Sequence, residues 1–196
     1  FIKKNYANWV SDEKGATNTR KPSSENTDRP LMSPDLFKRI LFPLLDKGEK
    51  IFFIVLDNFR YDQWRVLANE LSGLFNIEEQ LYFSILPTAT QYARNAIFSG
   101  LMPDQIAKLF PELWIDEDEE ENKNLNEAPL IRTIIERYRR SDTFSYHKIN
   151  DASSAERLLA QLPALAQNDL NVAVFNFIDM LSHSRTESKM IRELAS

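Results

Sequence analysis

The chain has 196 residues, of which 43% are hydrophobic and 27% charged, and its formal net charge is −5 at pH 7. This composition is typical of a globular protein with one buried core. The absence of cysteine excludes disulfides and thiolate metal sites, and is compatible with a cytoplasmic location. The acidic balance argues against avid, non-specific nucleic-acid binding, and no apolar run reaches the roughly 18 residues of a membrane span.

The N-terminal part of the chain is polar. Residues 11–34 are rich in Ser, Thr, Asn and Pro, which predicts a linker or a mobile loop. Residues 1–10 are too few to fold alone, and we interpret them as the end of a preceding element. The folded part is expected to begin with a helix over residues 34–48, where leucines and an isoleucine recur at helical spacing and Gly48 provides a stop.

Two continuous apolar runs, residues 50–57 and 171–179, predict strands that are covered on both faces, as in a parallel sheet. Weaker strand candidates are residues 80–86 and 142–149. Helical patterns between the strands occupy residues 61–75, 91–100, 129–140 and 155–162. Strands alternating with helices predict an α/β fold, arranged as a three-layer αβα sandwich around a mostly parallel sheet.

Each of the two apolar runs stops at an aspartate, Asp57 and Asp179. Ligands of open α/β sheets bind beyond the carboxyl ends of the strands, so the two carboxylates could share a metal ion. The alternative is that each aspartate simply caps a following helix. His183 follows Asp179 at a spacing that one helical turn would bring to the same face, which makes half of a zinc site. The other histidine, His147, lies in a predicted strand and is interpreted as structural.

The segment PTATQYARNAIFSGLMP, residues 87–103, places two threonines after a predicted strand and before a predicted helix. A hydroxyl at a helix N-terminus faces free N–H groups that favour an anion such as phosphate. With its proton displaced by a metal ion, such a threonine becomes a nucleophile. The alternative is that Thr88 or Thr90 only caps the helix.

The pattern P-T-x-T followed by G-L-x-P resembles the nucleophile segment of the alkaline phosphatase superfamily, and most closely its nucleotide phosphodiesterase branch. The resemblance implies that Thr90 is the nucleophile and a metal ligand. It implies that Asp57 is a ligand of the same metal, and that Asp179 and His183 are ligands of a second one. The stretch IVLDNFRYDQW is similar to the opening motif of the PglZ group within this superfamily.

The resemblance further implies a site with two zinc ions, for which manganese is chemically an alternative. Thr90 would attack phosphorus in line and form a phospho-threonine-type intermediate. Arg94 and Asn95 would contact non-bridging oxygens of the substrate, unless they are surface residues of an exposed helix face. The expected substrate is a nucleotide or a short oligonucleotide phosphodiester.

The chain as a whole resembles PorX-type response regulators, in which a receiver domain and a helical connector precede a PglZ domain. This implies that residues 1–34 are the tail of the connector with its linker. Residues 35–196 would be the N-terminal portion of a PglZ domain, because the further Asp, His and His ligands of the pattern do not follow His183. The fragment alone is expected to be inactive.

Such regulators are cytoplasmic effectors of two-component systems that control type IX secretion. The resemblance therefore implies a histidine kinase and a sigma factor as partners of the full-length protein, and a homodimer is also among the expected assemblies. The alternative function is a non-catalytic regulatory module that acts through protein contacts with a sigma factor or a secretion component, with a structural or vestigial metal site.

Overall fold

The structure is a computed structural model that describes residues 2–14, 29–114 and 126–180. The chain divides into two compact units, each built from two separate stretches of sequence. Unit 1 comprises residues 1–43 and 80–141, and unit 2 comprises residues 44–79 and 142–196. The polar residues 15–28 of the predicted linker lie outside the described part.

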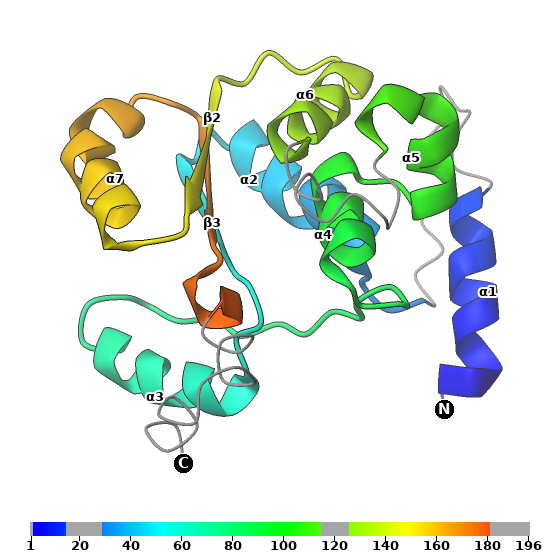
Figure 1. The fold of residues 1–196 in the computed structure, drawn as a ribbon, viewed down its shortest axis with the longest axis horizontal. Helices are drawn as coiled ribbons and strands as arrows, with labels where there is room; N and C mark the ends of the chain where they lie inside the picture. Colours follow the sequence, from blue (N-terminus) through cyan, green and yellow to red (C-terminus); the bar gives the residue numbers. More distant parts are fainter. Residues whose placement is uncertain (1, 15–28, 115–125, 181–196) are drawn as a thin grey trace. The chain divides into compact units, whose positions relative to one another are not determined.

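Unit 2 contains a parallel sheet of three strands: β1 (Ile51–Leu56), β2 (Phe144–Ile149) and β3 (Leu170–Phe175), in the order β1-β3-β2. The helices of this unit are α3 (Tyr61–Leu71) and α7 (Ala152–Leu165); Figure 1 shows α7 beside the sheet and α3 beyond the ends of its strands. The prediction of an α/β fold with a parallel sheet is thus confirmed. The weak strand candidate at residues 142–149 is also correct.

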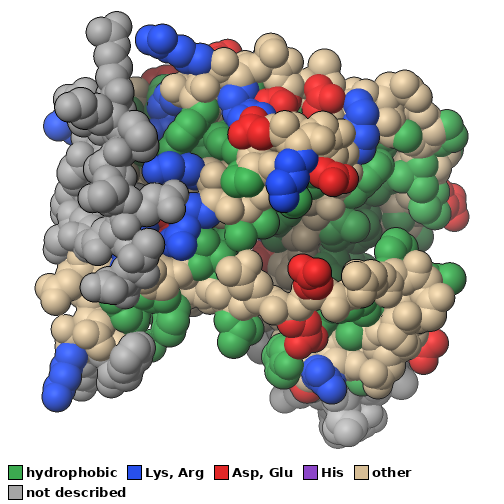
Figure 2. All heavy atoms as spheres, turned by 180° about the vertical axis from the view of Figure 1, so that it is seen from behind, with side chains coloured by type: hydrophobic (Ala, Val, Ile, Leu, Met, Phe, Trp, Pro, Cys, Tyr) green, Lys and Arg blue, Asp and Glu red, His purple; other side chains and the backbone are tan. Residues whose placement is uncertain are grey.

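The central strand and the edge strand differ in burial. β3 is buried along almost its whole length, as its unbroken apolar run predicts. In β1 the burial alternates, and Phe52 and Ile54 are 40% and 54% exposed. The prediction of cover on both faces is therefore right for β3 and wrong for β1, because Phe52 and Ile54 point to one face of the sheet and are exposed there. Hydrophobic side chains are visible at the molecular surface among charged ones (Figure 2).

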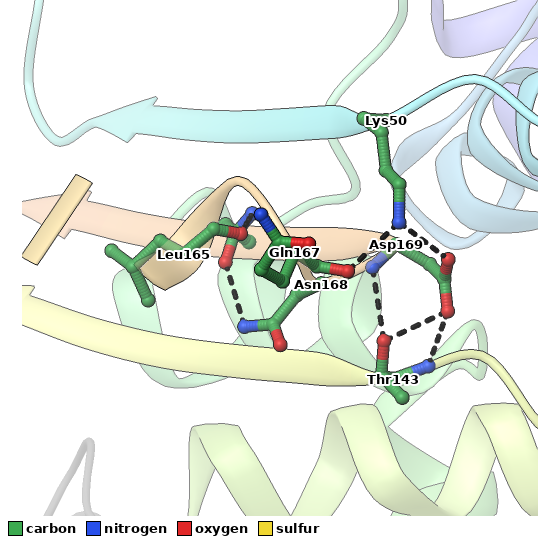
Figure 3. Close-up of polar contacts among 7 residues, drawn as sticks. Lys50, Thr143, Leu165, Gln167, Asn168 and Asp169 are labelled. Atoms are coloured by element: carbon green, nitrogen blue, oxygen red, sulfur yellow. Dashed lines mark hydrogen bonds and ion pairs between the residues drawn. The ribbon is translucent and has the colours of Figure 1, made fainter. Parts of the chain in front are cut away.

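The amino-terminal edge of the sheet is held together by one carboxylate. Asp169 Oδ2 accepts hydrogen bonds from the backbone N–H and the hydroxyl of Thr143, both at 2.8 Å. Lys50 Nζ donates to Asp169 Oδ1 at 3.1 Å and to the carbonyl of Gln167 at 2.8 Å (Figure 3). Residues flanking all three strands thereby meet at one side chain. These bonds hold the pKa of Asp169 at about 2, chiefly through Thr143 and then Lys50.

Unit 1 is helical in its described part. It contains α1 (Ile2–Lys14), α4 (Thr90–Ser99), α5 (Pro103–Leu109), α6 (Glu127–Arg137) and the 3-10 turns Ser33–Asp35 and Pro111–Leu113. α4 and α6 pack together and supply large buried side chains such as Phe98, Ile131 and Ile134. Gly100 ends α4 with φ +63°, a left-handed conformation that glycine adopts readily at the end of a helix.

Two predicted elements of unit 1 differ in the structure. Residues 80–86 form no strand but only an isolated bridge between Met32 and Phe83. The next donor, Ile85 N–H, bonds to the hydroxyl of Ser33 rather than to backbone, so the ladder does not continue. The predicted helix 34–48 contains the π-helical turn Phe37–Leu41 before α2 (Phe42–Asp46). Proline at 43 lacks an N–H and crowds the carbonyl four residues earlier, which disfavours regular α geometry there.

No described helix is long and apolar enough to cross a membrane.

Candidate active site

The carboxyl-terminal edge of the sheet carries polar groups from each strand. β1 and β3 run in register to the pair Leu56 and Phe175, and Asp57 N–H continues the ladder by donating to the carbonyl of Phe175 at 3.0 Å. Asp57 therefore lies directly at the end of β1, where the apolar run predicts it. Its side chain is half-buried.

Asp179 is placed differently from the prediction. β3 ends at Phe175, and residues 177–180 are already helical, so the strand does not run up to the aspartate. Asn176 makes the turn: its N–H donates to the carbonyl of Ile149 on β2, and its own carbonyl accepts from Met180 N–H. The apolar residues after Asn176 suggested a longer strand because a short apolar run does not distinguish a strand from a helix.

Asp57 and Asp179 thus follow two adjacent parallel strands at the same edge of unit 2. A helical Asp179 is compatible with the spacing that would bring His183 to the same face, but His183 lies outside the described residues. Carboxylate oxygens suit a divalent cation, so the two aspartates fit the donor chemistry of the expected metal. Within residues 2–14, 29–114 and 126–180, no group of three or more His, Asp or Glu side chains is gathered to hold a metal ion.

Asn150 and Asn176 are polar residues at this edge that the sequence reasoning missed. Asn176 Nδ2 donates to Asn150 Oδ1 at 3.0 Å and so ties the ends of β2 and β3 together. The signal that could have identified Asn176 is the polar residue that interrupts the apolar run VAVFNFI.

The motif after Asp57 forms the start of α3. Arg60 Nε and Nη2 donate to the two carboxylate oxygens of Asp62 at 2.9 and 2.7 Å, and Arg60 N–H donates to Gln63 Oε1 at 2.9 Å. The bidentate bond from Arg60 lowers the pKa of Asp62. Asn58 has φ 57°, in the left-handed region that Asn tolerates better than most residues. Arg60 and Asp62 thus form an exposed ion pair at the start of α3.

Thr90 is the first residue of α4, in unit 1. The N-cap position belongs to Ala89, and no side chain caps the helix. The alternative that Thr88 or Thr90 serves as the cap is therefore wrong. The Thr90 side chain is half-buried at a helix N-terminus, where uncapped N–H groups and the helix dipole favour an anion.

Arg94 and Asn95 follow in α4, and both are buried, with exposures of 4% and 6%. The alternative that they lie on an exposed helix face is thus wrong. Arg94 Nε donates to Glu127 Oε1 at 2.5 Å, and Glu127, at the start of α6, is fully buried. This ion pair gives Arg94 a structural role, because a buried charge is stable only with a partner. Contact of Arg94 or Asn95 with substrate stays a prediction.

The other end of α4 is fixed by Arg137 of α6, whose Nη2 donates to the carbonyl of Ser99. Burial lowers the pKa of Arg137. Glu127 was not identified from sequence, since a charged residue on an amphipathic helix is ordinarily expected to be exposed. The Arg94–Glu127 ion pair and the hydrogen bond from Arg137 to Ser99 thus hold α4 against α6 at two points.

His147 lies in β2, as expected, with Nε2 at 3.0 Å from Ser145 Oγ. Ser145 in turn donates to Asn171 Oδ1 of β3 at 2.8 Å. Partial burial lowers the pKa of His147. The side chain therefore belongs to a polar contact between strands.

The comparison with known proteins matches residues 36–196 to the family described as the BREX system PglZ alkaline phosphatase-like domain. The comparison with curated proteins gives no match. The matched region contains Asp57, Asp179 and all of α4. Its superfamily is of the phosphoesterase type. The chain belongs to the PglZ family of alkaline phosphatase-like domains.

Proposed function

We propose that this chain carries part of a metal-dependent phosphodiesterase that uses Thr90 as its nucleophile and acts on nucleotide or short oligonucleotide phosphodiesters. The observation that carries the proposal is the position of Asp57 and Asp179, which follow adjacent parallel strands at one sheet edge in a chain of the PglZ family. Carboxylates beyond the ends of parallel strands form the usual ligand site of open α/β sheets.

In the proposed reaction, Asp57 and Thr90 would hold one zinc ion and Asp179 and His183 a second, with manganese as an alternative metal. The metal ions would supply positive charge and lower the pKa of the attacking hydroxyl. Thr90 loses its proton to solvent, and its Oγ1 forms a bond to phosphorus while the bond to the leaving alcohol breaks. Water then attacks phosphorus and releases Thr90 Oγ1, which recovers a proton. The N-terminus of α4 favours the anionic phosphoryl group throughout.

The substrate class is small because the chain has a net charge of −5 and would repel a long polyanion. Arg94 and Asn95 are proposed to orient the phosphate, with Arg94 doing so from within its ion pair with Glu127. A dimer and a cytoplasmic location accompany the proposal through the likeness to PorX-type regulators. The same likeness leads us to propose that a histidine kinase controls the full-length protein and that the protein contacts a sigma factor in type IX secretion.

The non-catalytic regulatory module is the second candidate, and it would be favoured by exposed apolar surface on the connector helix. In α1, Trp9 is 8% exposed and packs within unit 1, whereas Ile2 is 45% exposed. We prefer catalysis because Asp57 and Asp179 follow adjacent parallel strands in a chain of the PglZ family.

The test is hydrolysis of bis-(p-nitrophenyl) phosphate by the full-length protein with added zinc, comparing wild type with Thr90→Val. We expect turnover by wild type and its loss in the variant, with the bound metal content of both measured. Thr88→Val is the matched control, because Thr88 is exposed two positions earlier and should keep full activity. Activity in Thr90→Val equal to wild type, or no turnover by metal-loaded wild type, would overturn the proposal in favour of the regulatory module.

A further inference from the structure

The helix α1 lies outside the region matched to the PglZ family, yet it is part of the core of unit 1. Trp9 is buried together with Met32, Ile85, Ala93, Ala96 and Met102, and Tyr6 and Val10 pack against this cluster. The Trp9 ring lies 5.1 Å from that of Phe83, centroid to centroid. The matched region begins only at residue 36. A segment outside the family domain thus contacts the stretch that leads into α4.

The most specific of these contacts is a hydrogen bond to the chain just before Thr90. Leu86 N–H donates to the Tyr6 hydroxyl at 2.6 Å, between residues 80 positions apart in sequence. Pro87 follows and has no N–H, and its ring restricts φ. The Leu86 N–H is therefore the anchor from which the chain turns through residues 87–89 into α4.

The same cluster also holds the chain after Thr90. Ala93 and Ala96 belong to it, and Tyr92 packs against it, so the first turns of α4 rest on the apolar residues that surround Trp9. Thr90 thus lies between two anchors, Leu86 and the Tyr92–Ala93 pair, and both are attached to the cluster that contains α1. A movement of α1 would be passed to the backbone on both sides of Thr90.

We propose that α1 positions the Thr90 segment, with Tyr6 as the positioning residue, so that displacement of α1 regulates the reaction. The effect of α1 on catalysis rests on the proposed function of Thr90. The contact between α1 and the backbone around Thr90 does not depend on that function. A misplacement of about 1 Å at a reacting group can cost about 100-fold in rate. Loss of a single hydrogen-bonded anchor should cost less.

The test compares wild type with Tyr6→Phe in the full-length protein and uses Asn8→Ala as the control, because Asn8 is on the exposed face of α1. The first readout, amide hydrogen exchange without substrate, does not depend on activity. We expect Tyr6→Phe to raise exchange about 10-fold in peptides covering residues 86–93 and to leave α6 unchanged. The second readout is hydrolysis of bis-(p-nitrophenyl) phosphate, where kcat should fall about 10-fold with KM changed less than two-fold.

The outcomes separate this inference from the proposed function. Unchanged exchange at residues 86–93 would overturn the positioning role, since Tyr6 would then have no effect on this segment. Exchange that rises equally in α6 would overturn it too, since Tyr6 would then stabilise the whole unit and not this segment. Raised local exchange with unchanged kcat in an active enzyme would overturn it as well. If wild type does not turn over but local exchange rises as expected, the mechanical role of α1 stands and the proposed function fails.

Discussion

The two edges of the sheet in unit 2 use aspartate in opposite ways. At the amino-terminal edge, Asp169 is engaged by Thr143 and Lys50, which join the residues flanking the three strands. At the carboxyl-terminal edge, Asp57 and Asp179 follow the strands in a family whose superfamily hydrolyses phosphate esters. We propose that the amino-terminal edge contributes stability and that the carboxyl-terminal edge binds the ligand, since ligands of open α/β sheets bind beyond the carboxyl ends of the strands.

The largest effect expected from this contrast is on activity at the carboxyl-terminal edge. Asp57→Asn and Asp179→Asn should each lower kcat/KM at least about 100-fold. Loss of a residue that only hydrogen-bonds to a metal ligand already costs up to about 100-fold, so loss of a ligand itself should cost at least as much. The free energy of unfolding should fall by about 1 kcal/mol or less, because each half-buried side chain keeps an acceptor oxygen. The measurements are phosphodiester hydrolysis and urea unfolding. A large loss of stability with activity intact would show that these aspartates are structural.

The reverse pattern is expected for Asp169→Asn at the amino-terminal edge. This variant keeps an acceptor oxygen but loses the charge that strengthens the bonds from Thr143 and Lys50. We expect the free energy of unfolding to fall by about 1 kcal/mol, a value reduced for solvent screening because the side chain is 38% exposed. Activity per folded molecule should equal that of wild type. A loss of activity without a loss of stability would contradict the assignment of this edge to structure.

Acid should weaken the amino-terminal edge through the same carboxylate. The folded pKa of Asp169, about 2, is below its ordinary value, so its contribution to stability is complete above about pH 5. That contribution is lost as the pH falls through about 4 towards 2, where the unfolded and then the folded carboxyl become protonated. Urea unfolding of wild type and Asp169→Asn between pH 5 and 2 should converge. Curves that stay parallel over this range would exclude Asp169 as a source of acid sensitivity.

A smaller effect is expected from His147, between the two edges. Burial lowers its pKa in the folded state, so its neutral form is favoured and protonation opposes folding. Its contribution is complete above the ordinary pKa of about 6.5 and declines as the pH falls below that value. His147→Gln should be less sensitive to pH than wild type below about 6.5. Thermal unfolding at pH 5 and 8 measures this difference, and equal sensitivity would contradict it.

Several elements could be predicted from local sequence because their causes are local. The apolar runs at β1 and β3, the helical stripe of α6 and the glycine at the end of α4 each specify one element directly. The failures have tertiary causes. Phe83 lies in a stretch whose residues favour a strand, but the next backbone N–H, that of Ile85, donates to the hydroxyl of Ser33 and so ends the ladder. The apolar residues around Phe177 predict a strand from sequence. In the structure Asn176 bonds to β2 and the chain continues as a helix.

The sequence by itself determined the family motif, the parallel α/β sheet and the position of Asp57 at the end of β1, because each depends on residue type and on spacing along the chain. Only the tertiary structure decided that Arg94 is buried on Glu127, that Ala89 rather than a threonine occupies the N-cap, and that Tyr6 holds the chain before Thr90. Each of these three features depends on how the folded chain places residues relative to one another. No local pattern encodes which distant group satisfies a buried charge or a backbone N–H.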